Sequence, residues 1–144
     1  MKILGLAVLV LVVAVAGGLI FLAQKSKSGS PPGIVGGKLA PCPSSPNCVS
    51  SEEGTDDAHR VAALSGIAWD RLPDLIQAEG GRIVERKDDY LAAEFSTKLM
   101  GFVDDVEFRK AEDTTHVRSA SRVGRSDFGA NRKRVEALRA ALGE

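Results

Sequence analysis

The sequence lacks an excess of either charge, because 19 lysines and arginines balance 19 aspartates and glutamates. Domains dedicated to nucleic acid are usually strongly basic, so the zero net charge argues against a nucleic-acid partner. The charge is uneven along the chain, with an acidic segment at 52–57 and a basic C-terminal third. Such runs are most simply interpreted as a solvated surface.

Aromatic residues are also few, with one Trp and one Tyr, and much of the apolar content lies in the first 23 residues. The polar and charged remainder is just long enough to bury one modest core. The chain contains no P-loop, no dinucleotide-binding glycine motif and no glycine-flanked serine nucleophile. The motifs therefore predict no catalytic residue and no cofactor.

Cysteine is scarce, since the sequence has only Cys42 and Cys48, in a segment whose prolines exclude a helix. A metal centre needs further ligands at suitable spacing, and no other Cys or His is close in sequence, so no metal site is predicted. A disulfide that closes this short loop is favoured, because the N-terminal segment indicates export to an oxidising compartment. A reactive or merely buried thiol pair is the alternative.

The N-terminal segment has no charged or strongly polar side chain from Ile3 to Ala23. This length spans a hydrocarbon core of roughly 30 Å as a helix, so residues 1–24 are expected to be a transmembrane anchor or a signal. Ala14-Val15-Ala16 resembles a signal-peptide cleavage site, but the apolar run continues past it, which favours a retained anchor. Lysines flank both ends and leave the orientation open. A disulfide would place the domain on the periplasmic or extracellular side of the cell membrane.

Residues 25–40 are rich in Ser, Gly, Pro and Lys without apolar periodicity, which predicts a flexible linker. The remainder, 41–144, is expected to form one domain. Its helices are predicted over 67–79 and 127–142. Its strands are predicted over 82–86, 90–96, 102–110 and 115–123. Short strands with short turns are typical of an antiparallel meander. We therefore expect an α+β fold, with a four-stranded antiparallel sheet covered by two amphipathic helices and preceded by an N-terminal transmembrane helix.

Two apolar helix faces are expected to cover that sheet. Trp69 lies on the apolar face of the first helix and is most simply a core anchor. In the last helix the apolar face is predicted to consist of Phe128, Val135, Leu138 and Leu142. Ser126 or Asp127 is expected to cap this helix, and its opposite face is basic.

An acidic cluster lies on the third predicted strand. Strand alternation places Asp105 and Glu107 on one face and Asp104 on the other. Paired carboxylates of this kind can hold a cation or act as acid and base. The alternative is a structural role, in which the carboxylates pair with Arg118 and Arg122 on the neighbouring strand.

Arg118 and Arg122 share one face of the fourth predicted strand, with Ala120 between them, and are suited to gripping one anion. Ser126 and the backbone N–H groups at the start of the last helix can assist. The small side chain of Ser121 leaves room for a ligand or, equally, for close helix packing. The predicted ligand-binding residues are therefore Asp104, Asp105, Glu107, Arg118, Ser121, Arg122, Ser126, Asn131 and Arg132.

Three stretches in this order resemble a family catalogued as DUF1499, a domain of unknown function. They are the CPSSPNCVSS run at 42–51, GFVDDVEF at 101–108, and the Arg-, Ser- and Gly-rich stretch at 117–134. The resemblance covers about Pro41 to Leu142. It implies a protein of bacterial or plastid type that is often exported or attached to a membrane, and it implies no particular activity.

These observations lead to the expectation of a membrane-anchored, extracytoplasmic binding or accessory module in the bacterial envelope. Its partners are expected to be the membrane, through the N-terminal helix, and an anionic small molecule or lipid headgroup. A metal- or carboxylate-dependent hydrolase-like enzyme is one alternative. A purely structural envelope protein, in which every arginine is paired, is another.

Overall fold

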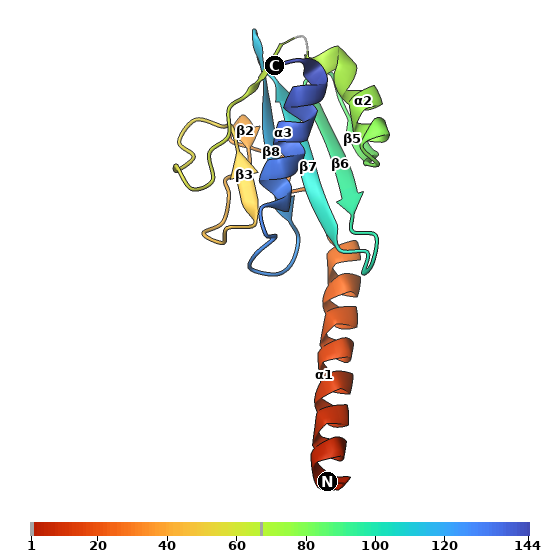
Figure 1. Ribbon diagram of the computed structural model, residues 1–144. Coiled ribbons are helices and arrows are strands. Elements are labelled where there is room, and N and C mark those ends of the chain that lie inside the picture. Colours follow the sequence, from red (N-terminus) through yellow and green to blue (C-terminus); the bar gives the residue numbers. More distant parts are fainter. Residues whose placement is uncertain (1, 67) are drawn as a thin grey trace.

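The computed structural model describes residues 2–66 and 68–144 of the chain. A long helix, α1 (Lys2–Lys27), projects as a single rod from an α+β domain (Figure 1). Two further helices, α2 (Ala68–Ala78) and α3 (Ala130–Leu142), lie against the sheet of that domain. The predicted fold class is confirmed in these elements, although Ile67, the predicted first residue of α2, lies outside the described residues.

The main sheet has six strands in the described residues, rather than the four that were predicted. They are β3 (Cys48–Ser50), β4 (Leu64–Ser65), β5 (Arg82–Arg86), β6 (Tyr90–Ser96), β7 (Val103–Lys110) and β8 (Thr114–Ser121). The predicted meander corresponds to β5–β8, and each neighbouring pair within it is antiparallel. The strand order is β3-β8-β7-β6-β5, and β4 pairs with the other end of β8.

The two missed strands both hydrogen-bond to β8, the last strand of the predicted meander. They contain only three and two residues, which is too short for an alternating apolar pattern to appear in the sequence. A second, two-stranded sheet consists of β1 (Ile34–Val35) and β2 (Lys38–Leu39). It lies within residues 25–40, the segment that was predicted as a flexible linker.

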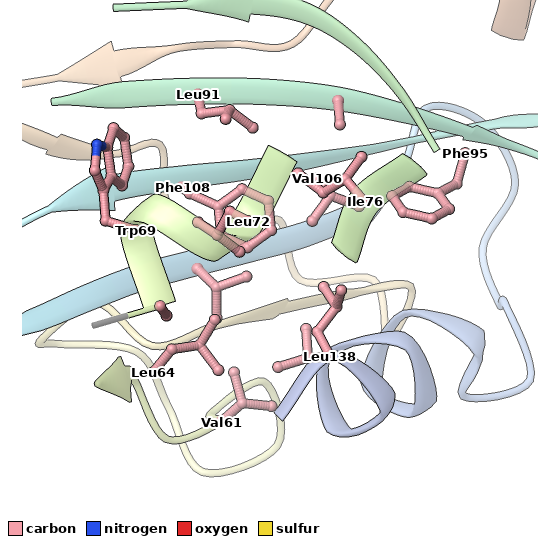
Figure 2. Packing of buried hydrophobic residues seen from close by; sticks show 14 of the residues in the cluster. Val61, Leu64, Trp69, Leu72, Ile76, Leu91, Phe95, Val106, Phe108 and Leu138 are labelled. Atoms are coloured by element: carbon pink, nitrogen blue, oxygen red, sulfur yellow. The ribbon is translucent and has the colours of Figure 1, made fainter. Parts of the chain in front are cut away.

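The hydrophobic core fills the space between one face of the sheet and helices α2 and α3 (Figure 2). Trp69, Leu72 and Ile76 of α2 pack there against side chains such as Val106 and Phe108 of β7. Burying each of these large apolar side chains stabilises the fold by roughly 1.5–3 kcal/mol. The predicted role of Trp69 as a core anchor is thus confirmed.

Helix α3 begins three residues later than predicted, which changes the role of Phe128. The left-handed conformation of Gly129, with φ of 79°, separates Phe128 from the helix. Phe128 was expected on the apolar helix face, and that prediction is wrong, because its side chain is 91% exposed. Val135 and Leu138 are buried in the core as predicted, and Leu142 packs at its edge.

Helix α1 is long and apolar enough to cross a membrane, by length and composition. Its segment Ile3–Lys27 has 25 residues and rises about 37 Å at 1.5 Å per residue, against a hydrocarbon core of roughly 30 Å. A signal sequence would satisfy the same criterion. Ser26, in the last turn of α1, joins the helix to the sheet, since its Oγ accepts a 2.7 Å hydrogen bond from the N–H of Val103.

Two glycines end α2 in a Schellman motif. The N–H of Gly80 donates to the carbonyl of Gln77 and the N–H of Gly81 to the carbonyl of Ile76. Gly80 has φ of 82°, which explains the first glycine. Gly81 has a different reason, because a Cβ there would lie 2.5 Å from Phe95 Cζ and 2.8 Å from Ile76 Cγ2.

Replacing Gly81 with Ala is therefore expected to lower the free energy of unfolding by about 1–3 kcal/mol through overpacking. Urea unfolding of the full chain in detergent, followed by Trp69 fluorescence, measures the change. The double variant G81A/F95L should lose less than the sum of its two single variants, because the smaller side chain makes room for the methyl group. Additive losses would show that Phe95 does not limit this site.

Candidate functional site

The carboxylates of β7 divide between the two faces of the sheet as predicted. Asp105 lies on the face away from α2 and α3 and binds Arg122, the residue directly after β8, with Nε–Oδ2 and Nη2–Oδ1 distances of 2.8 and 2.6 Å. The same Nη2 atom lies 2.6 Å from Oε1 of Glu94 on β6. Asp104 lies on the helix side, where its Oδ2 is 2.8 Å from Nη2 of Arg134.

The second pair on the same face is more deeply buried. Arg118 Nη1 lies 3.0 Å from Oε2 of Glu107, which is 0% exposed. Oε1 of Glu107 accepts hydrogen bonds from the Tyr90 hydroxyl at 2.8 Å and from the Gly33 N–H at 2.7 Å. Burial raises the pKa of Glu107, and the hydrogen bond from Tyr90 and the charge of Arg118 oppose this rise only in part. Burial, together with the Glu107 carboxylate, also raises the pKa of Tyr90.

A third pair involves Glu52, from the acidic segment that was interpreted as solvated surface. Arg109 Nε and Nη2 lie 2.8 and 2.9 Å from its two oxygens, and the Leu39 N–H donates to Oε1 at 3.0 Å. Burial by itself raises the pKa of Glu52, but the bonds from Arg109 and Leu39 outweigh it and hold the pKa below its usual value. We call the seven side chains of these three groups the charged layer; they are Glu52, Glu94, Asp105, Glu107, Arg109, Arg118 and Arg122.

The segment predicted as a flexible linker lies across the charged layer in the structure. Its backbone contributes the N–H groups of Gly33 and Leu39 to the layer, and the carbonyl of Ser26, which belongs to the last turn of α1, accepts from Arg122 at 3.1 Å. Leu39 packs with Tyr90 and two neighbours in a small second apolar cluster. Residues 28–40 thus form a strap over the second face of the sheet.

The strap and the ion pairs leave little of the predicted anion grip open to solvent. Arg118 is 7% exposed, and each of the two predicted arginines is bound to a carboxylate. Among the described residues, the buried Nε of Arg118 has no hydrogen-bond partner. The structure therefore contains the carboxylate–arginine pairing that the sequence offered as the structural alternative, and ligand binding by these residues stays a prediction.

On the helix side, the predicted site residues connect parts of the fold. Asn131 is fully buried and accepts from Ser119 Oγ at 2.6 Å, while its Nδ2 donates to the Asn47 carbonyl at 3.2 Å and to Ser121 Oγ at 3.0 Å. It thereby links α3 to β8 and to the loop before β3. Arg132 donates to the backbone carbonyls of residues 58 and 60. Ser126 is exposed.

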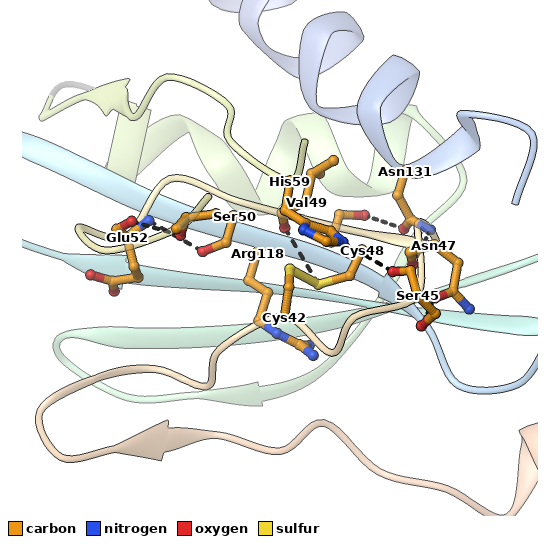
Figure 3. Close-up of a disulfide and its surroundings, with 12 residues drawn as sticks. Cys42, Ser45, Asn47, Cys48, Val49, Ser50, Glu52, His59, Arg118 and Asn131 are labelled. Carbon is orange, nitrogen blue, oxygen red and sulfur yellow. Dashed lines mark hydrogen bonds between the residues drawn. A yellow bond between two sulfur atoms is a disulfide. The ribbon is translucent and has the colours of Figure 1, made fainter. Parts of the chain in front are cut away.

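The loop before β3 is closed by the predicted disulfide between Cys42 and Cys48 (Figure 3). His59 is buried beside it, with Nδ1 2.8 Å from Asp56 Oδ2 and Nε2 3.1 Å from the Ser45 carbonyl. The hydrogen bond that the His59 ring donates to the Asp56 carboxylate raises the pKa of His59. In the described residues no group of three or more His, Cys, Asp or Glu side chains is arranged to hold a metal ion.

At the end of the domain next to α1, two loops carry exposed apolar side chains. Leu99, in the loop between β6 and β7, is 92% exposed, and Phe128 lies in the loop between β8 and α3. Figure 1 places both loops at the α1 end of the sheet. We call residues 97–102, 122–129 and the last turn of α1 the base of the domain. Of the residues of the base, Arg122 and Ser126 were predicted from the sequence as ligand-binding positions, and Leu99 and Phe128 were not.

The base is also basic on its surface. Its exposed cations are Lys25, Lys27, Lys98 and Arg125. None of them forms an ion pair with another described residue. The nearby carboxylates are engaged within the fold, since Asp104 binds Arg134 and Asp127 accepts from the backbone of α3. The surface charge of the base is therefore positive.

A cavity of about 470 Å³ lies between the base and α1. Its apolar lining consists of Leu19 and Leu22 of α1, Phe102, Val123 and Phe128 of the base, Val103 of β7 and Ala130 of α3. Polar residues at its edge have partners within the fold; Ser121, for example, accepts from Asn131. The volume is within the range of about 300–1,000 Å³ that is usual for small-molecule sites.

These features define a class of protein: a small α+β domain, with a disulfide and a buried charged layer, carried on one apolar helix. The chain belongs to the family described as "Protein of unknown function (DUF1499)", whose model matches residues 38–142. The match begins inside the strap and covers the whole sheet and both domain helices. No curated protein and no solved structure matches the chain.

The buried pair of Arg118 and Glu107 can be tested by removing one partner. Arg118→Met is expected to lower the free energy of unfolding at pH 7 by about 3–5 kcal/mol, because it leaves a buried carboxylate without its partner. The double variant R118M/E107L should recover most of the loss, since apolar side chains can replace a buried ion pair. Urea unfolding of the full chain in detergent provides the values.

As a control, Arg86→Met, at an exposed position, should change the free energy of unfolding by less than about 0.5 kcal/mol. An equally small effect of R118M would contradict a stabilising buried pair.

Asp127 offers a test with a defined pH dependence. Its carboxylate accepts from the N–H groups of Gly129 and Asn131 at 3.0 and 2.8 Å. The N-cap residue of α3 is Gly129, which has no side chain to cap the helix. Burial by itself raises the pKa of Asp127, but the hydrogen bonds from Asn131 and Gly129 outweigh it and lower the pKa below 3.8.

Asp127→Ala should therefore cost about 1 kcal/mol at pH 7, as for other helix-capping residues. Because the folded pKa is depressed, this contribution is present above pH 3.8 and is lost as the pH falls through the folded value. The difference in unfolding free energy between wild type and variant, measured from neutral to acidic pH, should shrink in that direction. A difference that is constant across this range would rule out the carboxylate as its source.

Proposed function

We propose that this protein is a single-pass membrane protein of the bacterial envelope, with its domain on the periplasmic or extracellular side and its base bound to anionic lipid headgroups. The observation that carries the proposal is the base itself, where exposed apolar side chains and unpaired cations occur together beside the end of α1. The two remaining parts of the proposal, the anchor and its orientation, are supported by α1 and by the disulfide.

The orientation is argued from the redox state of the cysteines. Disulfides persist in oxidising compartments and are rare in the cytosol. The Cys42–Cys48 bridge therefore favours a domain outside the cytoplasm. Ser26, in the last turn of α1, is hydrogen-bonded to the backbone of Val103 at the start of β7. The base therefore faces the membrane surface when α1 spans the membrane.

The exposure of the apolar side chains of the base to water is unfavourable, whereas a bilayer interface can bury them. Leu99 and Phe128 are 92% and 91% exposed, and both lie in loops of the base. Phe128 also has φ of 53°, a left-handed conformation that bulky residues rarely adopt. Strained residues of this kind tend to occur at functional positions. Aromatic and aliphatic side chains at the interface add affinity by burying their apolar area among the lipids.

The cations of the base supply the electrostatic part. Each Lys or Arg near an anionic membrane surface contributes about 1 kcal/mol of attraction. The base has four such exposed residues, and none has an acidic partner among the described residues. The attraction acts over a Debye length of about 8 Å at physiological salt, so it requires the base to lie close to the headgroups.

A small anion bound by Arg118 and Arg122 has less support, because binding would require breaking ion pairs under the strap. A carboxylate-dependent enzyme has less support for the same reason, since Asp104, Asp105 and Glu107 each bind an arginine. A structural role of the charged layer is compatible with lipid binding at the base. The lipid headgroup is therefore the partner that the geometry favours.

The proposal can be tested by hydrogen exchange on the full chain in nanodiscs. Amides in 97–102 and 122–129 should exchange more slowly in discs that contain phosphatidylglycerol than in pure phosphatidylcholine, and high salt should abolish the difference. The variant K98E/R125E should lose this protection, because about 1 kcal/mol of attraction per cation is removed and repulsion is added.

The matched control is R86E/K110E, which makes the same change of charge at the opposite end of β5 and β7. It should leave the protection of the base unchanged. Equal exchange in anionic and neutral discs for the wild type, with the fold intact, would overturn the proposed headgroup binding.

A further inference from the structure

We infer that the cavity between α1 and the base is a binding site for one acyl chain of a neighbouring membrane lipid. This inference rests on the proposed function, since it requires the base to lie on the membrane. It goes further by assigning a ligand of defined chemistry, a hydrocarbon chain, to a particular cavity. The charged layer has no part in it.

The position of the cavity along α1 is the first argument. A hydrocarbon core of roughly 30 Å takes about 20 helical residues. Counted from Ile3, these residues end at Leu22. Leu19 and Leu22, which form one wall of the cavity, therefore lie in the last turn inside the hydrocarbon region. The next turn carries Lys25, whose cation belongs at the level of the headgroups.

The chemistry of the walls is the second argument. Seven apolar residues line the cavity, and they come from α1, from the loops of the base and from the adjoining ends of β7 and α3. The polar residues at its edge are engaged elsewhere, as Asp127 is with the backbone of α3 and Asp104 with Arg134. The cavity thus offers apolar contact and few free hydrogen-bonding groups, which suits a hydrocarbon chain and not a sugar or a nucleotide.

The exposure of the wall residues is the third argument. Leu19 and Leu22 are 41% and 36% exposed, against 57% and 68% for their neighbours Ile20 and Phe21. The domain therefore covers one side of the last apolar turn of α1 without closing the space beside it. Lipid chains are the apolar molecules present at this depth, and a chain that enters the space supplies the contacts that an empty cavity would deny to its apolar wall.

The test uses the full chain in nanodiscs of phosphatidylcholine that carries a photoactivatable diazirine on one acyl chain. After irradiation and digestion, mass spectrometry should find crosslinks on 97–103 and 121–130 as well as on α1. Leu22→Trp narrows the cavity and should lower the crosslinks on 121–130 by about tenfold or more, the scale of a steric misfit in an apolar pocket. Ile20→Trp, on the same helix but away from the cavity, is the matched control and should leave them unchanged.

A second variant places the obstruction on the domain side. Ala130→Phe adds a ring at the edge of the cavity, and Ala137→Phe, at an exposed position of the same helix, is its control. Urea unfolding confirms that each variant is folded. If A130F and L22W both leave the crosslinks on 121–130 unchanged, the cavity does not hold the chain.

Phosphatidylcholine separates this inference from the proposed function, because it carries no net charge. Crosslinks on α1 alone, in a protein whose base is protected from exchange in anionic discs, would overturn the acyl-chain site and leave headgroup binding intact. Crosslinks on 121–130 without charge-dependent protection would support the acyl-chain site and overturn the role of the cations. If the crosslinks on 121–130 and the charge-dependent protection are both missing, both the acyl-chain site and headgroup binding are overturned.

Discussion

The charged layer is the constraint on which the rest of this structure depends. Both faces of the sheet are buried, one by an apolar core and the other by the strap over three groups of carboxylates and arginines. A buried charge without a partner costs several kcal/mol, so every member of the layer needs a counter-charge and the strap has to supply backbone donors. Glu107 shows this most clearly, because its two oxygens accept from Arg118, Tyr90 and the backbone of Gly33.

The same layer connects the sheet to α1. Arg122 binds Asp105 and Glu94 on the sheet and donates to the carbonyl of Ser26 in the last turn of the helix. Ser26 in turn exchanges hydrogen bonds with Val103 at the start of β7. The helix is thus attached to the end of the sheet by buried polar contacts. This attachment places the base beside α1 and creates the cavity between them.

The arrangement separates structure from proposed function in an unexpected way. The arginines and carboxylates that attract most attention in the sequence lie under the strap or against the helices and pair with one another. The features that face outward at the base are plain leucine, phenylalanine and lysine side chains, which attract little notice in a sequence. Leu99 and Phe128 become informative only when their exposure, their common position and the adjacent helix are known together.

The sequence alone was sufficient for the apolar helix, the disulfide, the α+β class, the order of β5–β8 and the family, because each depends on local periodicity, spacing or motif. Strand alternation also predicted that Asp105 and Glu107 share a face and that Asp104 does not.

Tertiary structure decided the rest. The strands β3 and β4 are too short to show a pattern, and they form because β8 offers unpaired backbone groups. The strap has no apolar periodicity, and its hydrogen bonds to the charged layer come from the backbone N–H groups of Gly33 and Leu39, which leave no pattern in the sequence. The spacing of Phe128 from the apolar residues of α3 fits a helix, but Gly129 has a left-handed backbone conformation and α3 begins only after it. Phe128 is therefore outside the helix, because the spacing of apolar residues does not reveal a single backbone dihedral.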